Sequence, residues 1–295
     1  MENRIIYVYI ISAIVFWGSA PAIIKLFLTN LDVFQITFFM FLLATICLFF
    51  LIFIRGKYKQ FFLKDIKEYL YYALMGFIGI FLYFQFLFIG ILHSSAQEAY
   101  VINYTWPLWM VIFSIILLKD HIKIRNILSI LIGFIGLLVI ITNGDLIGFT
   151  SEKILGYISA LLSALFYGLF SALGKKYTKD ITISIFYYFL FSSLYSCIFL
   201  MLFSSVPTMT FQESTAILWL GIFSCAFGFL FWFKSLQFCN TSELVNYMFI
   251  TPFVSLSFVY LLIIEQVQWS SLVGLCIIII AIFIDRIDFI KLSTS

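Results

Sequence analysis

The sequence predicts an all-α polytopic membrane protein whose ten transmembrane helices form two inverted five-helix repeats. The first observation behind this prediction is composition: of 295 residues, 64% are hydrophobic and 11% are charged, and the mean hydropathy is +1.13. A soluble domain has about 25% charged residues, so this chain has too few charged side chains to form a surface exposed to water. The other two observations are an internal repeat and an uneven distribution of Lys and Arg among the loops.

Ten apolar stretches follow one another along the chain. Most approach the roughly 20 residues that a helix needs to cross about 30 Å of hydrocarbon. Backbone polar groups find no water inside a bilayer, so each stretch is expected to be a helix. The first stretch also resembles a signal peptide, but the sixth repeats its pattern inside the chain, so we interpret it as a retained helix. The stretches lie near residues 5–28, 33–54, 70–91, 96–118, 124–142, 154–174, 183–204, 216–237, 243–264 and 271–289.

The internal repeat is visible at two offsets, 145 and 150 residues, whose difference is what an unequal loop length would produce. The pairs at 145 residues are Glu98 and Glu243, Pro107 and Pro252, and Asp120 and Glu265, and those at 150 are Tyr7 and Tyr157, Gly18 and Gly168, and Lys25 and Lys175. The pattern predicts one repeat over residues 1–145 and a second over 151–291. In membrane proteins such duplication is typical of transporters.

Lys and Arg are distributed unevenly between alternate loops. With the N-terminus inside, fifteen of the 17 fall on the inner side, and only Lys25 and Lys153 fall on the outer side. This bias predicts that both termini are cytoplasmic. Because each repeat has five spans, an odd number, the second must be inverted relative to the first. We therefore expect an integral, multi-pass protein of a bacterial inner membrane, surrounded by the lipid bilayer.

Two carboxylates, Glu98 and Glu243, lie at matching positions near the starts of the fourth and ninth spans. An acidic side chain in a membrane can couple transport to protons or bind a substrate amine. The other interpretation is helix capping, because Ser95 and Asn240 stand three residues earlier and complete a capping box or its Asn variant. We favour capping, and Glu98, Glu243 and Lys25 stay as candidates for coupling.

Three prolines are expected to shape the interior. Pro107 and Pro252 lie about nine residues into their spans, where each removes a helical hydrogen bond and kinks the helix, and Pro21 is expected to open the first helix in the same way. An opened backbone is tolerated in a membrane where it faces protein or a water-filled cavity. A packing kink without a ligand is the alternative, but the matching positions of two kinks favour a cavity.

Aromatic and polar side chains near these prolines are candidates to line that cavity. Aromatic residues make up 21% of the chain, so most of them must face lipid or other helices. A cavity with aromatic walls and few hydrogen-bonding groups suits a small, partly apolar solute. The predicted substrate-binding residues are Trp17, Tyr83, Gln85, Asn103, Tyr104, Trp106, Tyr167 and Tyr247.

With these residues the chain resembles the ten-helix drug/metabolite transporters built from two EamA repeats, along nearly its whole length. The segment 97–107 is similar to the Glu-…-Asn-Tyr-x-Trp-Pro segment of YddG-type aromatic amino-acid exporters. The resemblance implies that Tyr104 and Trp106 line a central cavity. The chain departs from those exporters at Tyr167, where a Trp is usual, and in a shorter spacing between the third and fourth spans.

The sequence contains no Gly-x-Ser-x-Gly elbow, no His-Glu-x-x-His and no nucleotide-binding loop. We therefore expect no enzyme activity, no cofactor, no metal and no nucleic-acid partner. The prediction is a secondary transporter that exports aromatic or other apolar amino acids by alternating access. A monomer is expected, with an oligomer left open. Two alternatives stay open: a transporter of a nucleoside-containing metabolite such as S-adenosylmethionine, and a non-transporting membrane scaffold.

Overall fold

Every described element of the computed structural model is helical, as the composition predicts, and no strand occurs in that part of the chain. The structure describes residues 2–28, 30–61, 65–94, 99, 102–119, 123–141, 151–176, 180–238, 241–263 and 269–286. Within these ranges seven helical stretches are long and apolar enough to cross a membrane: Ile5–Ile24, Val33–Ile54, Ile66–His93, Ile154–Lys175, Ile181–Phe203, Phe211–Phe238 and Leu244–Leu262. In their described parts, the other three predicted spans, the fourth, fifth and tenth, coincide with helices that fall short of that criterion.

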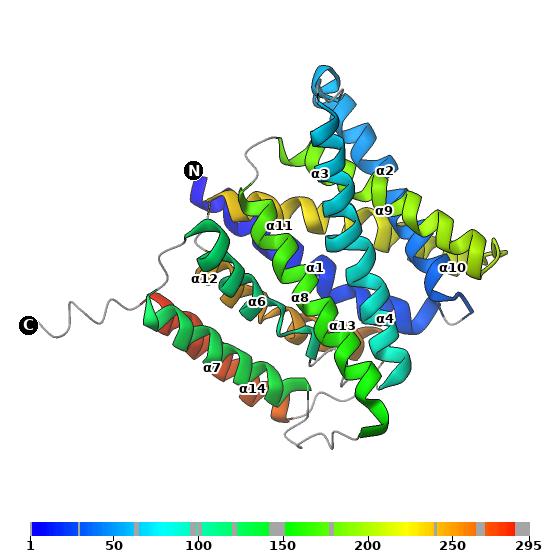
Figure 1. Ribbon diagram of the computed structural model, residues 1–295. Helices are drawn as coiled ribbons and strands as arrows, with labels where there is room; N and C mark the ends of the chain where they lie inside the picture. Colours follow the sequence, from blue (N-terminus) through cyan, green and yellow to red (C-terminus); the bar gives the residue numbers. More distant parts are fainter. Residues whose placement is uncertain are drawn as a thin grey trace, which may run out of the picture.

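The two halves of the chain contain closely similar series of helices (Figure 1). The first half comprises α1 (Glu2–Phe27), α2 (Val33–Ile54), η1 (Tyr58–Gln60), α3 (Ile66–Gly76), η2 (Phe77–Leu82), α4 (Tyr83–His93), α6 (Trp106–Phe113), η3 (Ser114–Leu118) and α7 (Ile124–Ile141). The second half comprises η4 (Ser151–Lys153), α8 (Ile154–Lys176), α9 (Ile181–Phe203), α10 (Phe211–Trp219), η5 (Leu220–Phe227), α11 (Gly228–Phe238), α12 (Thr241–Met248), α13 (Thr251–Ile263) and α14 (Trp269–Arg286). The third span of each half has a π-helical segment in its middle, η2 or η5, a geometry that often occurs at functional sites.

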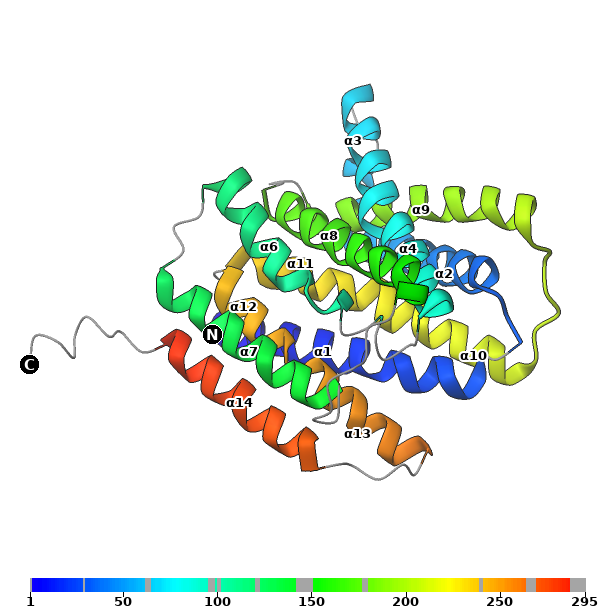
Figure 2. The ribbon, with the colours of Figure 1, turned by 60° about the horizontal axis from the view of Figure 1, so that its bottom comes forward.

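Helices of the two halves pack against each other throughout the core. The main pairs are α2 with α9 and α7 with α14, while α8 packs against α4 and α6, and α1 packs against α11 and α13. The α7–α14 pair runs along one edge of the molecule in both views (Figures 1 and 2). Between helices of such apolar composition, tight packing provides much of the association energy, because lipid chains are as apolar as the helices. The core therefore lies at the interface of the halves.

Two glycines allow helices from different halves to cross closely. A Cβ atom added at Gly168 in α8 would lie 2.6 Å from the Cβ of Trp109 in α6. One added at Gly18 in α1 would lie 2.8 Å from Cγ1 of Val254 in α13. The glycines are 150 residues apart and their partners 145, which are the two offsets found in the sequence. The same helix crossing therefore occurs twice.

In each half, one aspartate caps the N-terminus of the second span. Asp32 accepts hydrogen bonds from the backbone N–H groups of Phe34 and Gln35 at 2.8 and 3.0 Å. Asp180 accepts from Thr182 and Ile183 at 2.9 and 3.3 Å. Aspartate is a favoured N-cap, since its carboxylate satisfies N–H groups that lack a partner inside the helix. Each cap fixes the point at which the long apolar helix begins.

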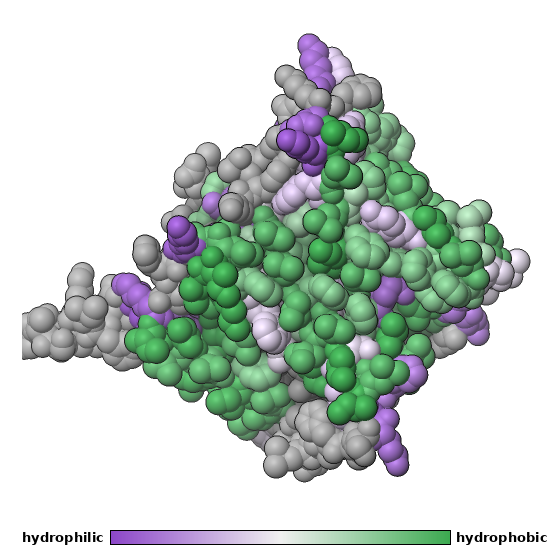
Figure 3. Space-filling model, viewed as in Figure 1, coloured by the Kyte–Doolittle hydropathy of each residue, from purple (hydrophilic) through white to green (hydrophobic). Residues whose placement is uncertain are grey.

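Hydrophobic side chains cover most of the face shown in Figure 3. Among the described residues the exposed fraction reaches 59% for Phe50 and 79% for Met201, each in a long apolar helix. An apolar surface of this extent is unfavourable in water and suits contact with lipid chains. With its long apolar helices, the protein is an integral, multi-pass membrane protein.

Candidate functional site

A cavity of about 120 Å³ lies between the two halves, at the middle of the long helices. Its wall is mostly aromatic and aliphatic, and none of the residues that form it is charged. They are Trp17, Ala20, Ile24, Met40, Tyr83, Phe84, Leu87, Phe88, Asn103, Tyr104, Trp106, Tyr167, Leu220, Ser224, Cys225, Phe229, Met248 and Thr251. Concave, largely apolar cavities with a few polar groups are the usual form of small-molecule sites.

Six of the eight predicted substrate-binding residues lie in this wall, namely Trp17, Tyr83, Asn103, Tyr104, Trp106 and Tyr167. Gln85 and Tyr247 are not among the wall residues. Gln85 lies two residues after Tyr83, on the opposite side of α4, and its side-chain amide donates to Thr37 in α2 at 3.4 Å. Tyr247 packs edge-on against Tyr7, with ring centroids 6.2 Å apart.

Tyr167 is at the centre of an aromatic cluster in the wall. Its ring centroid lies 4.7 Å from that of Tyr83, 4.9 Å from that of Trp106 and 6.2 Å from that of Trp17. The two Trp contacts are edge-to-face, an arrangement in which the positive edge of one ring meets the negative face of another. Four rings from α1, α4, α6 and α8 therefore meet at one point, which a linear sequence does not show.

Hydrogen bonds hold two of the wall residues in place. The indole N–H of Trp17 donates to the backbone carbonyl of Ser224 in η5 at 2.9 Å. The amide nitrogen of Asn103 donates to the Ser163 hydroxyl in α8 at 2.7 Å, and Ser163 donates in turn to the carbonyl of Ala160 at 2.8 Å. Asn103 is 3% exposed, so this pairing satisfies a donor that burial would otherwise leave without water.

Two hydroxyl groups in the wall are buried without a hydrogen-bond partner in the described part of the chain. They belong to Tyr167, which is 3% exposed, and to Thr251, which is 4% exposed. The Tyr167 hydroxyl lies near Ser171, one turn further along α8, whose own hydroxyl accepts from the Trp232 indole at 3.3 Å. A buried hydroxyl without a partner is unfavourable, so each is available to a ligand. The sequence analysis did not select Thr251, although it stands 145 residues after Trp106.

The fourth and ninth spans are interrupted just before their prolines. A turn at residues 104–105 precedes α6, and a turn at 249–250 separates α12 from α13. The turns have matching hydrogen bonds, from the N–H of Thr105 to the carbonyl of Ile102 at 3.0 Å and from Ile250 to Tyr247 at 3.1 Å. At Pro21, in contrast, no such turn interrupts the chain, and α1 is continuous from Glu2 to Phe27.

The structure does not describe the side chains of the candidate coupling residues. Glu98 lies outside the described residues altogether. Glu243 is in the first turn of α12 and Lys25 is near the end of α1, but their side chains are not described, and the same holds for Pro21 and Pro252. Among the described residues, no group of three or more His, Cys, Asp or Glu side chains could hold a metal ion.

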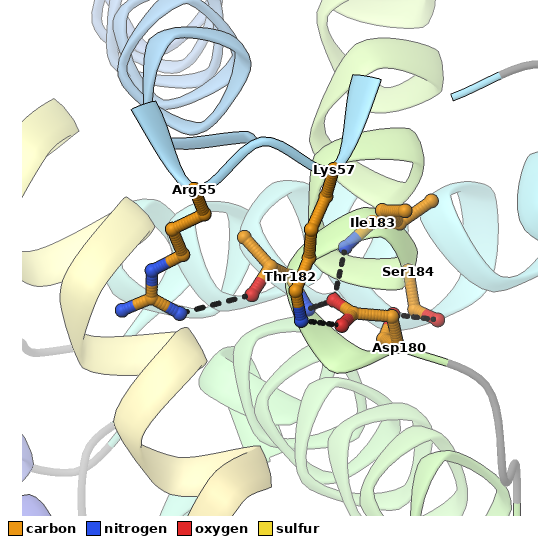
Figure 4. A network of polar contacts seen from close by, with 6 residues as sticks. All are labelled: Arg55, Lys57, Asp180, Thr182, Ile183 and Ser184. Atoms are coloured by element: carbon orange, nitrogen blue, oxygen red, sulfur yellow. Dashed lines mark hydrogen bonds and ion pairs between the residues drawn. The ribbon is translucent and has the colours of Figure 1, made fainter. Parts of the chain in front are cut away.

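An ion pair joins the halves at one end of the α2–α9 pair. Lys57, just after α2, pairs with the Asp180 carboxylate, and Arg55 donates to the Thr182 hydroxyl at 3.5 Å (Figure 4). Burial alone would raise the pKa of Asp180. The hydrogen bond and charge of Lys57, with the N–H groups of Ile183 and Thr182, outweigh burial and lower that pKa below its usual value. The sequence analysis did not predict this pair.

Several known proteins are similar to this chain. It is 22% identical over 275 residues to an uncharacterized transporter of Archaeoglobus fulgidus, covering 91% of this chain and 92% of that protein. It is 23% identical over 287 residues to the uncharacterized transporter YoaV of Bacillus subtilis, covering 95% and 96%. It is 25% identical over 158 residues to the aromatic amino acid exporter YddG of Ancylobacter novellus, covering 53% and 55%.

A protein of known crystal structure superposes on this one with a TM-score of 0.85 and 19% identity over 95% of each chain, which shows a shared fold. Residues 4–142 match the EamA-like transporter family, and residues 154–284 match it a second time. The two matches together cover nearly the whole chain and confirm the resemblance drawn from the sequence. The protein therefore belongs to the EamA-like transporter family and is a membrane transporter.

Proposed function

We propose that the protein is a secondary transporter that exports small aromatic or other apolar amino acids, with the cavity between its halves as the substrate site. The observation that carries the proposal is the uncharged, aromatic wall of this cavity. Ring contacts with such a wall are worth about 0.5–1.5 kcal/mol each beyond simple burial. The similarity to an aromatic amino acid exporter over about half of each chain supports the same substrate class.

The size of the cavity favours one ring over a nucleoside. An apolar cavity of roughly 150 Å³ in another protein stays dry and binds benzene. The cavity here, about 120 Å³, is of that order. S-adenosylmethionine carries a base, a ribose and an amino-acid chain, so it needs several times the space of one ring. The volume therefore favours a solute built around a single ring over one that contains a nucleoside.

Alternating access is proposed to come from two inverted five-helix repeats, over residues 1–145 and 151–291. The helix crossing that occurs twice, at Gly18 and at Gly168, supports this arrangement. The interruptions of the fourth and ninth spans at matching positions support it as well. Two similar units that meet at a mid-membrane cavity can rock against each other and open the cavity to either side in turn.

The proposed orientation places both termini in the cytoplasm of a bacterial cell. Its basis is the excess of Lys and Arg in alternate loops. The start of α1 and the end of α14 lie on the same side of the molecule in both ribbon views (Figures 1 and 2). The ion pair between Lys57 and Asp180 then closes the α2–α9 pair at its cytoplasmic end.

Counterflow in liposomes tests the proposal. Vesicles that contain the purified protein and unlabelled amino acid should accumulate labelled phenylalanine or tryptophan. Vesicles loaded instead with unlabelled adenosine should not accumulate labelled adenosine. Accumulation of adenosine alone would favour the nucleoside alternative. Absence of flux for every solute would favour a scaffold and contradict the proposal.

A matched pair of Trp variants tests the assignment of the site. Trp106 lies in the cavity wall and is 5% exposed, whereas Trp269 is 83% exposed at the start of α14. Trp106→Ala should weaken the apparent affinity for phenylalanine by roughly two- to tenfold, because it removes a stacking surface worth about 0.5–1.5 kcal/mol. Trp269→Ala should change it little. Equal losses in the two variants would indicate an effect on folding or anchoring, and the cavity assignment would then be wrong.

A further inference from the structure

We propose that the cavity binds the ammonium group of its solute, through oxygen acceptors and ring faces, and that the Tyr167 and Thr251 side chains hold this group. The inference rests on the proposed function, because a transported amino acid carries both an ammonium and a carboxylate group. In this proposal the polar contacts of the site hold the ammonium group, and Thr251 supplies one of these contacts.

The two hydroxyl groups supply side-chain acceptors. Tyr167 and Thr251 lie in the wall of the cavity, are 3% and 4% exposed, and have no hydrogen-bond partner in the described part of the chain. A hydroxyl oxygen has two lone pairs, so each can accept an N–H of an ammonium group. Hydrogen bonds to a charged group are stronger than neutral ones, which favours a charged ligand group at such acceptors.

Backbone carbonyls at the two helix interruptions add further acceptors. Pro107 has no N–H to donate to the carbonyl of Asn103, four residues earlier. Pro252 has none for the carbonyl of Met248. Asn103 and Met248 both belong to the cavity wall. A carbonyl oxygen can only accept, so these positions complement an ammonium group and repel a carboxylate.

Apart from the two hydroxyl groups themselves, donors in the wall are largely used within the protein. The indole N–H of Trp17 donates to Ser224, and the Asn103 amide donates to Ser163. The starts of α6 and α13 each contain a proline, and the N–H groups that follow donate back to the carbonyls of the preceding turn, that of Thr105 in the case of α6. The helix starts therefore offer few N–H groups to an anion, despite the favourable sign of their dipoles.

The aromatic cluster provides a second means of binding a cation. The rings of Tyr83, Trp106 and Trp17 surround Tyr167 at centroid distances of 4.7, 4.9 and 6.2 Å. A cation within about 6 Å of a ring centroid is attracted to the negative face of the ring, most strongly for Trp and where water is excluded. The wall thus compensates an ammonium charge without a carboxylate of its own.

Competition between two phenylalanine analogues tests the inference. 2-Phenylethylamine keeps the ring and the ammonium group, and 3-phenylpropionate keeps the ring and the carboxylate group. In counterflow of labelled phenylalanine, the amine should inhibit at a concentration about tenfold lower than the acid, as one hydrogen bond to a charged group would give. Equal potency, or stronger inhibition by the acid, would overturn the inference while leaving phenylalanine transport established.

Variants that remove single hydroxyl groups identify the atoms involved. Thr251→Val keeps the side-chain shape, Tyr167→Phe keeps the ring, and each should weaken inhibition by the amine about tenfold. Ser196→Ala is a matched control, because Ser196 in α9 is also buried without a partner in the described chain but is not in the cavity wall. An effect of Ser196→Ala equal to the other two would overturn the assignment.

A binding measurement separates this inference from the proposed function. 2-Phenylethylamine should raise the melting temperature of the purified protein in detergent, and Thr251→Val should abolish the rise, since only a ligand that binds the folded state stabilises it. If the rise occurs without phenylalanine flux, the proposed substrate is wrong and the ammonium site stands. If phenylalanine is transported but 3-phenylpropionate alone raises the melting temperature, the ammonium site is wrong.

Discussion

Gly168→Ala tests a close crossing between the halves at the edge of the cavity. The added Cβ would lie 2.6 Å from the Cβ of Trp109, 2.8 Å from the backbone nitrogen of Met110 and 3.0 Å from the carbonyl oxygen of Trp106. Two of these three atoms belong to the backbone, so α6 itself would have to move. Overpacking of this kind costs about 1–3 kcal/mol, from which the gain of about 0.5–1 kcal/mol for Ala over Gly in a helix is subtracted.

Gly18→Ala is the matched comparison, because the same crossing occurs there with a softer neighbour. The nearest atom to the added Cβ is Cγ1 of Val254 at 2.8 Å, whereas the backbone nitrogen of Ser255 is 3.3 Å away. The Val254 methyl group can yield by a small side-chain movement. The destabilisation at Gly18 should therefore be clearly smaller than at Gly168, although both glycines occupy corresponding positions.

Thermal melting of the purified protein in detergent measures the difference. Gly168→Ala should lower the melting temperature by several degrees, given about 2–4 °C for each kcal/mol in chains of 150–250 residues. Leu161→Ala is the control, because this α8 side chain is 41% exposed and lies two turns before Gly168. The reasoning would be refuted by an unchanged melting temperature for Gly168→Ala, or by a larger decrease for Gly18→Ala.

Two further predictions concern polar pairs between the halves. Because the pKa of Asp180 is lowered in the folded protein, its pairing with Lys57 stabilises the fold above the unfolded-chain value of about 3.9, and this stability is lost as the pH falls through the lower folded-state pKa. The melting temperature should therefore fall with acidification below about pH 4, and Asp180→Asn should flatten this dependence; parallel curves for the two proteins would contradict the pairing. Ser163→Ala removes the acceptor of the buried Asn103 amide and should destabilise the protein by about 1–3 kcal/mol in the melting assay, whereas no change would mean that the amide has another partner.

Much of the cavity could be predicted from the sequence, for a reason specific to membranes. Polar and amphipathic side chains are rare in apolar spans, so Asn103 and Tyr104 stand out beside Pro107 in the fourth span. The repeat then directed attention to the corresponding aromatic positions Trp17 and Tyr167. These side chains do lie in the wall, although their binding to a solute stays a prediction.

The failures of the sequence analysis come from side-chain direction. Gln85 is as unusual in its span as Tyr83, but residues two apart in a helix lie on opposite faces. A span without amphipathic periodicity does not reveal which of these faces points inward. Thr251 was not among the predicted residues. Only the structure shows that its hydroxyl is buried in the wall without a partner in the described chain.

The sequence by itself determined that this protein lies in a lipid bilayer and is helical, because a bilayer accepts only apolar spans whose backbone groups form hydrogen bonds internally. It also showed the duplication, which leaves matching residues at constant offsets. The tertiary structure alone decided which helices pair, where α6 and α13 begin, and that Lys57 meets Asp180 across 123 residues of chain. Such contacts depend on close packing between distant segments, and a pattern that is local in sequence contains no information about them.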